Sequence, residues 1–122
     1  LIRLEYQKPI IENNSIKGNI PVLDIQYGNV WSNIPDSFLK NLNISTGENI
    51  EVKIFNKDSL MYRGVVPYVK TFGDVKEKEA MGYLNSLMNF SLAINMGNFA
   101  DSFNIRNGKD WNIHLKKNSI PK

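Results

Sequence analysis

The sequence contains no cysteine, and this absence excludes several classes of site at once. Without a thiol the chain has no disulfide, no thiolate nucleophile and no Cys-ligated zinc. The only histidine, His114, lies in an alternating strand pattern where we expect it to face solvent. One histidine and no cysteine argue against a dedicated transition-metal site. We therefore expect the chain to bind no metal and no cofactor. The absence of cysteine also fits a reducing compartment, which we interpret as the cytoplasm.

Long apolar runs are also missing. No stretch approaches the roughly 20 apolar residues that a membrane-spanning helix needs. The first eight residues lack the uninterrupted apolar region of a signal peptide. We predict no membrane partner from this pattern.

Positive charge is present but not concentrated. The chain has 15 Lys and Arg against 12 Asp and Glu, and apart from the pair Lys116 and Lys117 the basic residues are scattered. A nucleic-acid-binding protein usually gathers them into a patch or stripe. This weakly favours a small-molecule site over nucleic acid, since folding can gather charges that the sequence scatters.

The chain has neither a Gly-rich phosphate loop nor alternating strands and helices, so a dinucleotide-binding fold or a P-loop enzyme is not expected. It shows instead many short strand-like runs with turn signals between them. This pattern favours a small all-β barrel or sandwich, and we predict a Greek-key-type β-barrel with one short helix, at residues 34–42. The expected strands are residues 16–26, 49–55, 60–70, 81–84, 90–95 and 111–116, and residues 97–103 are interpreted as a turn that could include one helical turn.

At 122 residues the chain fits one domain with its own core. Residues 1–15 contain Pro9 and the pair Asn13 and Asn14, with no sustained period. We interpret this segment as a linker arm from a missing N-terminal domain, and residues 16–122 as the β-barrel domain.

Residues 24–34 (DIQYGNVWSNI) are the strongest candidate for a site, because a strand-like run breaks at Gly28 among polar and aromatic residues. A glycine at such a break marks a bulge that re-aims its neighbours. Tyr27 and Trp31 would then flank the Asn29 amide and form a wall suited to a planar heterocycle. The alternative is a structural bulge whose aromatics fill the core. Asp24 has two interpretations as well: it pairs with a ligand ammonium, or it is an ordinary solvent-facing carboxylate.

Four blocks of sequence carry a family resemblance: residues 24–34, 71–74 (TFGD), 83–87 (YLNSL) and 93–100 (AINMGNFA). In this order and spacing, across residues 16–116, they resemble the C-terminal domain of the SAM hydroxide adenosyltransferases, or SAM hydrolases, relatives of SAM-dependent fluorinases and chlorinases. The resemblance implies a small β-barrel that binds the adenosine part of SAM against the N-terminal domain of a neighbouring subunit in a homotrimer.

The resemblance also assigns substrate-binding roles. It implies that Asp24 meets the methionyl amine, that Tyr27 and Phe72 pack on adenine, and that Asn29 hydrogen-bonds to it. The turn at Ser86 and Leu87 and the backbone of Met96 would read the adenine edge, and Trp31 would shape the wall. The chain departs from the family where Tyr27, Ser32 and Met88 stand in place of the more usual Phe, Thr and Gly.

The resemblance places the residues that activate water in the N-terminal domain, which this chain does not contain, so no catalytic residue is expected here. The leading hypothesis is the adenosine-binding part of an enzyme that cleaves SAM with water to adenosine and L-methionine. One alternative is a β-barrel module that stacks single-stranded nucleic acid on Tyr27, Trp31 and Phe72. Another is a structural oligomerisation domain with a buried aromatic cluster.

Overall fold

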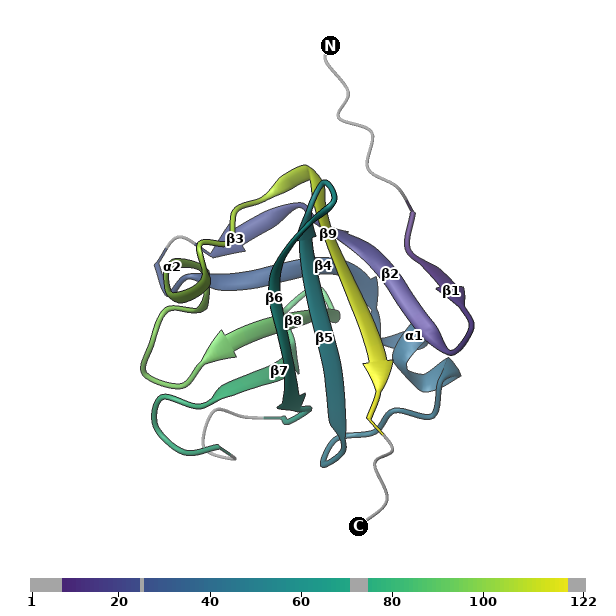
Figure 1. The fold of residues 1–122 in the computed structure, drawn as a ribbon. Coiled ribbons are helices and arrows are strands. Elements are labelled where there is room, and N and C mark those ends of the chain that lie inside the picture. Colours follow the sequence, from purple (N-terminus) through teal and green to yellow (C-terminus); the bar gives the residue numbers. More distant parts are fainter. Residues whose placement is uncertain (1–7, 25, 71–74, 119–122) are drawn as a thin grey trace.

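Two antiparallel sheets pack against each other in the computed structural model, which describes residues 8–24, 26–70 and 75–118 (Figure 1). The five-stranded sheet has the order β1-β2-β9-β5-β6, with bounds Ile10–Glu12, Ser15–Ile20, Gly108–Lys117, Asn49–Asn56 and Ser59–Pro67. The four-stranded sheet has the order β3-β4-β8-β7, with bounds Val22–Asp24, Asn29–Pro35, Asn89–Ile94 and Ala80–Leu84.

The core lies between the two sheets because their strands alternate apolar and polar residues. In β5 the side chains of Ile50, Val52 and Ile54 are fully buried. Phe90 and Leu92 of β8 are buried from the opposite sheet. Figure 1 shows β4, β8 and β7 running across the direction of β9, β5 and β6, so the two layers cross. Each sheet therefore keeps an outer face on which its other side chains lie.

Pro21 separates two strands where one was expected. The predicted strand 16–26 is divided into β2 and β3, which belong to different sheets. Proline has no N–H for a strand ladder, so a change of sheet at Pro21 leaves no donor missing. A second link is a parallel bridge between Tyr68 and Gly82. The all-β prediction is confirmed, but the described strands form two joined sheets and not a closed ring.

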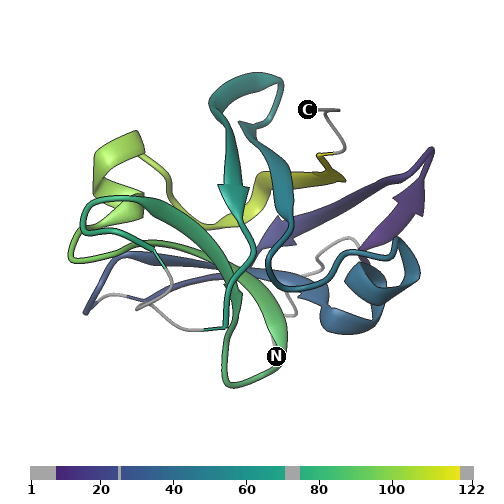
Figure 2. The same cartoon turned by 90° about the horizontal axis from the view of Figure 1, so that it is seen from below.

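Two short helices flank the sheets. The predicted helix at 34–42 is α1, Asp36–Asn41, and the helical turn considered within 97–103 is α2, Phe99–Phe103. They lie on opposite sides of the molecule in both Figure 1 and Figure 2. The segment predicted as a linker arm contains β1, which pairs with β2.

Gly28 joins the β3–β4 turn to α2. Its φ is +69°, and its N–H donates to the Asp24 carbonyl at 2.6 Å, which closes the turn. Its carbonyl accepts from the Ala100 N–H at 2.9 Å. A Cβ at this position would overlap the side chain of Asn98, which caps α2 by accepting from the Asp101 N–H. Only glycine combines this backbone conformation with this close approach.

We predict that Gly28→Ala destabilises the fold more than Gly47→Ala does. Gly47 also has a positive φ, +95°, but nothing lies within 4 Å of the position that an alanine Cβ would occupy there. The control therefore carries backbone strain alone, about 1–2 kcal/mol, whereas overlap with Asn98 adds about 1–3 kcal/mol at Gly28. Urea unfolding followed by circular dichroism measures both losses. Equal losses would contradict the proposed packing of Asn98 on Gly28.

Candidate ligand-binding site

Three of the predicted site residues share the outer face of the four-stranded sheet. The β3–β4 register places Asp24 opposite Asn29 and Val22 opposite Trp31. Residues directly opposite each other, and residues two apart on one strand, lie on the same face of a sheet. Asp24, Asn29 and Trp31 are therefore neighbours, at the end of the sheet where Gly28 makes its turn.

The next two strands extend this face with polar side chains. Trp31 lies opposite Ser91 of β8, and Ser91 lies opposite Tyr83 of β7. Ser91 is fully buried, and its hydroxyl accepts a hydrogen bond of 2.9 Å from Asn85 Nδ2. The outer face thus carries a row of aromatic and hydrogen-bonding groups that crosses three strands.

Asn29 is held in place by Tyr83. The Asn29 side chain is buried, and its Nδ2 donates to the Tyr83 hydroxyl oxygen at 3.0 Å. Burial raises the pKa of the Tyr83 hydroxyl, and the nearby Asp24 carboxylate raises it further, while hydrogen bonds with Trp31, Asn29 and Ser91 partly offset this. Tyr83 is therefore a neutral hydrogen-bonding group at neutral pH, and it fixes the direction in which the Asn29 amide points.

Trp31 contributes an indole that is only partly exposed. Its Nε1 atom is buried. It interacts with the Tyr83 hydroxyl, which lowers the pKa of that hydroxyl. A buried indole N–H usually finds an acceptor. The Trp31 ring therefore lies partly covered on the outer face of the sheet.

Tyr27 and Asp24 lie at the open end of this face. Tyr27 is 58% exposed, and its hydroxyl accepts from Gln26 Nε2 at 3.1 Å. The Asp24 carboxylate is partly exposed and accepts from the Gln26 N–H at 3.1 Å. An exposed ring beside a carboxylate offers contacts to an aromatic ligand and to a cation.

Met96 lies at the same end, in the turn between β8 and α2. This turn is tied to the chain before β7, because Lys78 Nζ donates to the Met96 carbonyl at 2.6 Å and the Lys78 N–H donates to the Asn95 carbonyl at 2.7 Å. The Met96 side chain is 68% exposed. Asn98, two residues later, contacts Gly28, so Met96 and Tyr27 flank one end of the sheet.

Ser86 and Leu87 lie at the opposite end, in the β7–β8 turn. Asn85 builds this turn: its Oδ1 accepts from the Leu87 N–H at 2.8 Å. Met88 has a φ of +62°, a conformation that favours glycine. Six residues of β8 separate this turn from Met96, which corresponds to about 20 Å. The Ser86 turn and Met96 of one chain therefore lie at opposite ends of β8.

The remaining predicted residue, Phe72, lies outside the described residues. Within the described ranges, no three His, Cys, Asp or Glu side chains are grouped so that they could hold a metal ion. No helix in the same part of the chain has the length and apolarity to cross a membrane. The described face offers a carboxylate, amides, hydroxyls and aromatic rings, which are groups that can hydrogen-bond, stack and attract a cation.

Two residues of this face, Tyr83 and Ser91, were not singled out from the sequence as site residues. Both lie on predicted strands, and pairing these strands through the turn at 85–89 would have placed them opposite each other. Strand pairing was therefore the signal that could have identified them. Tyr83 was visible only as part of the block 83–87.

Comparison with known proteins agrees with this architecture. Residues 18–112 match the model of the SAM hydroxide adenosyltransferase C-terminal domain. The fluorinase of Nocardia brasiliensis (strain ATCC 700358 / HUJEG-1) is 27% identical over 114 residues, which is 88% of this chain and 35% of the fluorinase. The chain thus spans about a third of that relative.

Two solved structures share the fold. An uncharacterized conserved protein from Thermotoga maritima superposes with a TM-score of 0.81 at 24% identity, over 93% of this chain and 40% of that one. A conserved hypothetical protein from Thermus thermophilus gives a TM-score of 0.54 at 22% identity, over 81% and 34%. Because the family model covers most of the chain, including the whole Gly28 turn and the strands β4, β7 and β8, this chain belongs to the SAM hydroxide adenosyltransferase C-terminal domain family.

Proposed function

We propose that this chain is the adenosine-binding domain of a SAM hydrolase, whose complete form converts SAM and water to adenosine and L-methionine. The observation that supports this most strongly is the convergence of Asp24, Asn29 and Trp31 on one outer sheet face of a domain of this family. SAM combines a planar base with an ammonium group, and this face combines aromatic rings and an amide with a carboxylate. The match in chemistry favours SAM over a neutral ligand.

The geometry suggests how the contacts are shared. Tyr27 and Asn29 would hold adenine at the Gly28 end, with the Met96 backbone at its edge, and Asp24 would meet the ammonium. The Ser86 and Leu87 turn is about 20 Å away along β8. We therefore assign this turn to another part of the ligand or to a neighbouring subunit. Phe72 keeps its proposed role of packing on adenine.

Exposed apolar side chains around this face support a partner subunit. Val22 is 45% exposed, and Tyr27, Leu87 and Met96 are 58–68% exposed. Large exposed side chains at both ends of a polar sheet face are consistent with a surface that another protein covers. We propose that the N-terminal domain of a neighbouring subunit covers it in a homotrimer of the complete enzyme, and that this enzyme works in the cytoplasm.

The indole N–H of Trp31 should report ligand binding directly. We predict that adenosine or SAM shifts its resonance in ¹H–¹⁵N spectra of the chain, because Trp31 lies on the proposed site. Trp111, buried in the core on β9, is an internal control that should not shift. Equal shifts of both indoles, or no shift at millimolar adenosine, would contradict adenosine binding at this face.

The two ligands should separate the role of Asp24. Asp24→Asn should weaken SAM binding by about tenfold or more and leave adenosine binding nearly unchanged, because only SAM carries the ammonium. Asp101→Asn, an exposed carboxylate in the first turn of α2, removes the same charge and should change neither affinity. Calorimetric titration of both ligands measures this. Equal losses for SAM and adenosine would overturn the proposed contact.

The chain alone should not turn over SAM. The residues expected to activate water belong to the N-terminal domain of the family, so the purified chain should release no adenosine above background in a chromatographic assay. Turnover that persists through repeated purification and disappears in Asp24→Asn would contradict the proposal that this chain only binds.

A further inference from the structure

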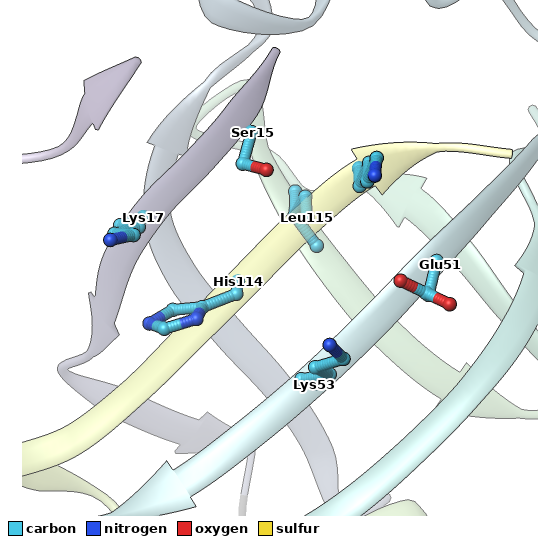
Figure 3. A pocket seen from close by; sticks show the side chains of 7 residues that line it. Ser15, Lys17, Glu51, Lys53, His114 and Leu115 are labelled. Atoms are coloured by element: carbon cyan, nitrogen blue, oxygen red, sulfur yellow. The ribbon is translucent and has the colours of Figure 1, made fainter. Parts of the chain in front are cut away.

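Four basic side chains form one row across the outer face of the five-stranded sheet. The strand register places Lys17 of β2 opposite His114 of β9, His114 opposite Lys53 of β5, and Lys53 opposite Arg63 of β6. Figure 3 shows Lys17, His114 and Lys53 on three adjacent strands around one pocket. Like charges directly opposite each other destabilise a sheet. Lys53 and Arg63 form such a pair, and His114 would form two more, with Lys17 and with Lys53, when its ring is protonated.

The neighbouring carboxylates neutralise only the two ends of this row. Glu12 lies 3.8 Å from Lys17 Nζ, and Glu51 lies 3.9 Å from the Arg63 guanidinium. Within the described ranges no carboxylate comes within 4.0 Å of Lys53 Nζ. The middle of the row, His114 and Lys53, thus has no ion pair within 4.0 Å among the described residues, although the Glu51 carboxylate lines the same pocket.

His114 is held at the centre of this row. Its ring lies 4.9 Å from the ring of Phe55, centroid to centroid. The side chain is half-buried, whereas the sequence analysis expected it to face solvent. Burial lowers the pKa of the imidazole below its usual value, and Lys17 and Lys53 lower it further. A tetrahedral oxyanion between these groups would reverse the effect of the two lysines.

A pocket of about 170 Å³ opens at this place, lined by Ser15, Lys17, Glu51, Lys53, His114, Leu115 and Lys116. We propose that this pocket binds the phosphate group of a small phosphorylated molecule. Lys17 and Lys53 supply positive charge, and the His114 ring donates a hydrogen bond between them. The Ser15 hydroxyl and Lys116 add donors at one end. The pocket belongs to the other sheet from the proposed SAM site, so the two inferences stand independently.

The proposal predicts a particular pH dependence. The groups that face His114 are Lys17 on β2 and Lys53 and Glu51 on β5, with Lys116 on its own strand and Lys57 and Asp58 beyond Phe55. Because the pKa of His114 is lowered in the folded chain, protonation costs stability as the pH falls below the usual value of 6.5. An anion that binds the imidazolium removes this cost, so anion affinity should rise as the pH falls.

The test is the titration of the His114 ring followed by NMR, with and without anion. Inorganic phosphate should raise its pKa, and sulfate, whose charge does not change over this range, should bind roughly three- to tenfold tighter near pH 5.5 than near pH 7.5. Methyl phosphate, titrated in parallel, should bind at least as tightly as inorganic phosphate if a phosphate ester is the natural ligand. If inorganic phosphate binds more tightly than methyl phosphate, the assignment of a phosphate ester is overturned and the ligand is free phosphate.

Charge-matched variants separate a site from general surface charge. Lys53→Gln should weaken phosphate binding roughly three- to tenfold, whereas Lys109→Gln, an exposed lysine near the start of the same strand as His114, should not. Lys17→Gln is a second variant that leaves the core untouched. Equal effects of all three substitutions, or a His114 shift that sodium chloride of the same ionic strength reproduces, would overturn the proposal.

Discussion

The close approach of Asn98 to Gly28 is the constraint on which the site depends. Because Gly28 has no Cβ and a positive φ, the β3–β4 turn closes at the Asp24 carbonyl and packs against the start of α2. This closure sets the register that places Asp24 opposite Asn29. A slip of β3 by one residue would move Asp24 to the other face of the sheet, away from Asn29. One backbone conformation thus decides which residues share the outer face of this sheet.

The polar row on this face serves both the fold and the site. One hydrogen bond links Asn29 to Tyr83 and another links Asn85 to Ser91, and all four side chains are buried or partly buried. A buried polar group that loses its partner costs about 1–3 kcal/mol, so removing one member affects stability as well as recognition. The Asn29–Tyr83 bond also fixes the direction of the Asn29 amide, which would lower the entropy lost when the proposed ligand binds.

Much of the fold was predictable from local pattern. Alternation in residues 49–55, followed by a turn and a second strand at 60–70, correctly predicted the β5–β6 hairpin, and Pro with Asp before an apolar period correctly predicted α1. The division of strand 16–26 at Pro21 was not predicted, because sheet membership depends on packing between distant strands. The separation of Ser86 from Met96 was hidden for a similar reason: both flank β8, and only the strand's direction shows that they lie at opposite ends. For Met88, the family resemblance implied a position where glycine is common, and the positive φ there gives the physical reason.

The strand register also explains how basic residues that are scattered in the sequence come together in the fold. Lys17, Lys53 and His114 are far apart in the sequence, and neither their number nor the small net charge of +3 indicates a basic site. Strand pairing brings them to adjacent positions on one sheet, whereas Asp24 lies on the outer face of the other. An apolar core separates these faces, since packed sheets are about 10 Å apart. Opposite charge preferences can therefore coexist in one small domain, because each sheet presents its own outer face.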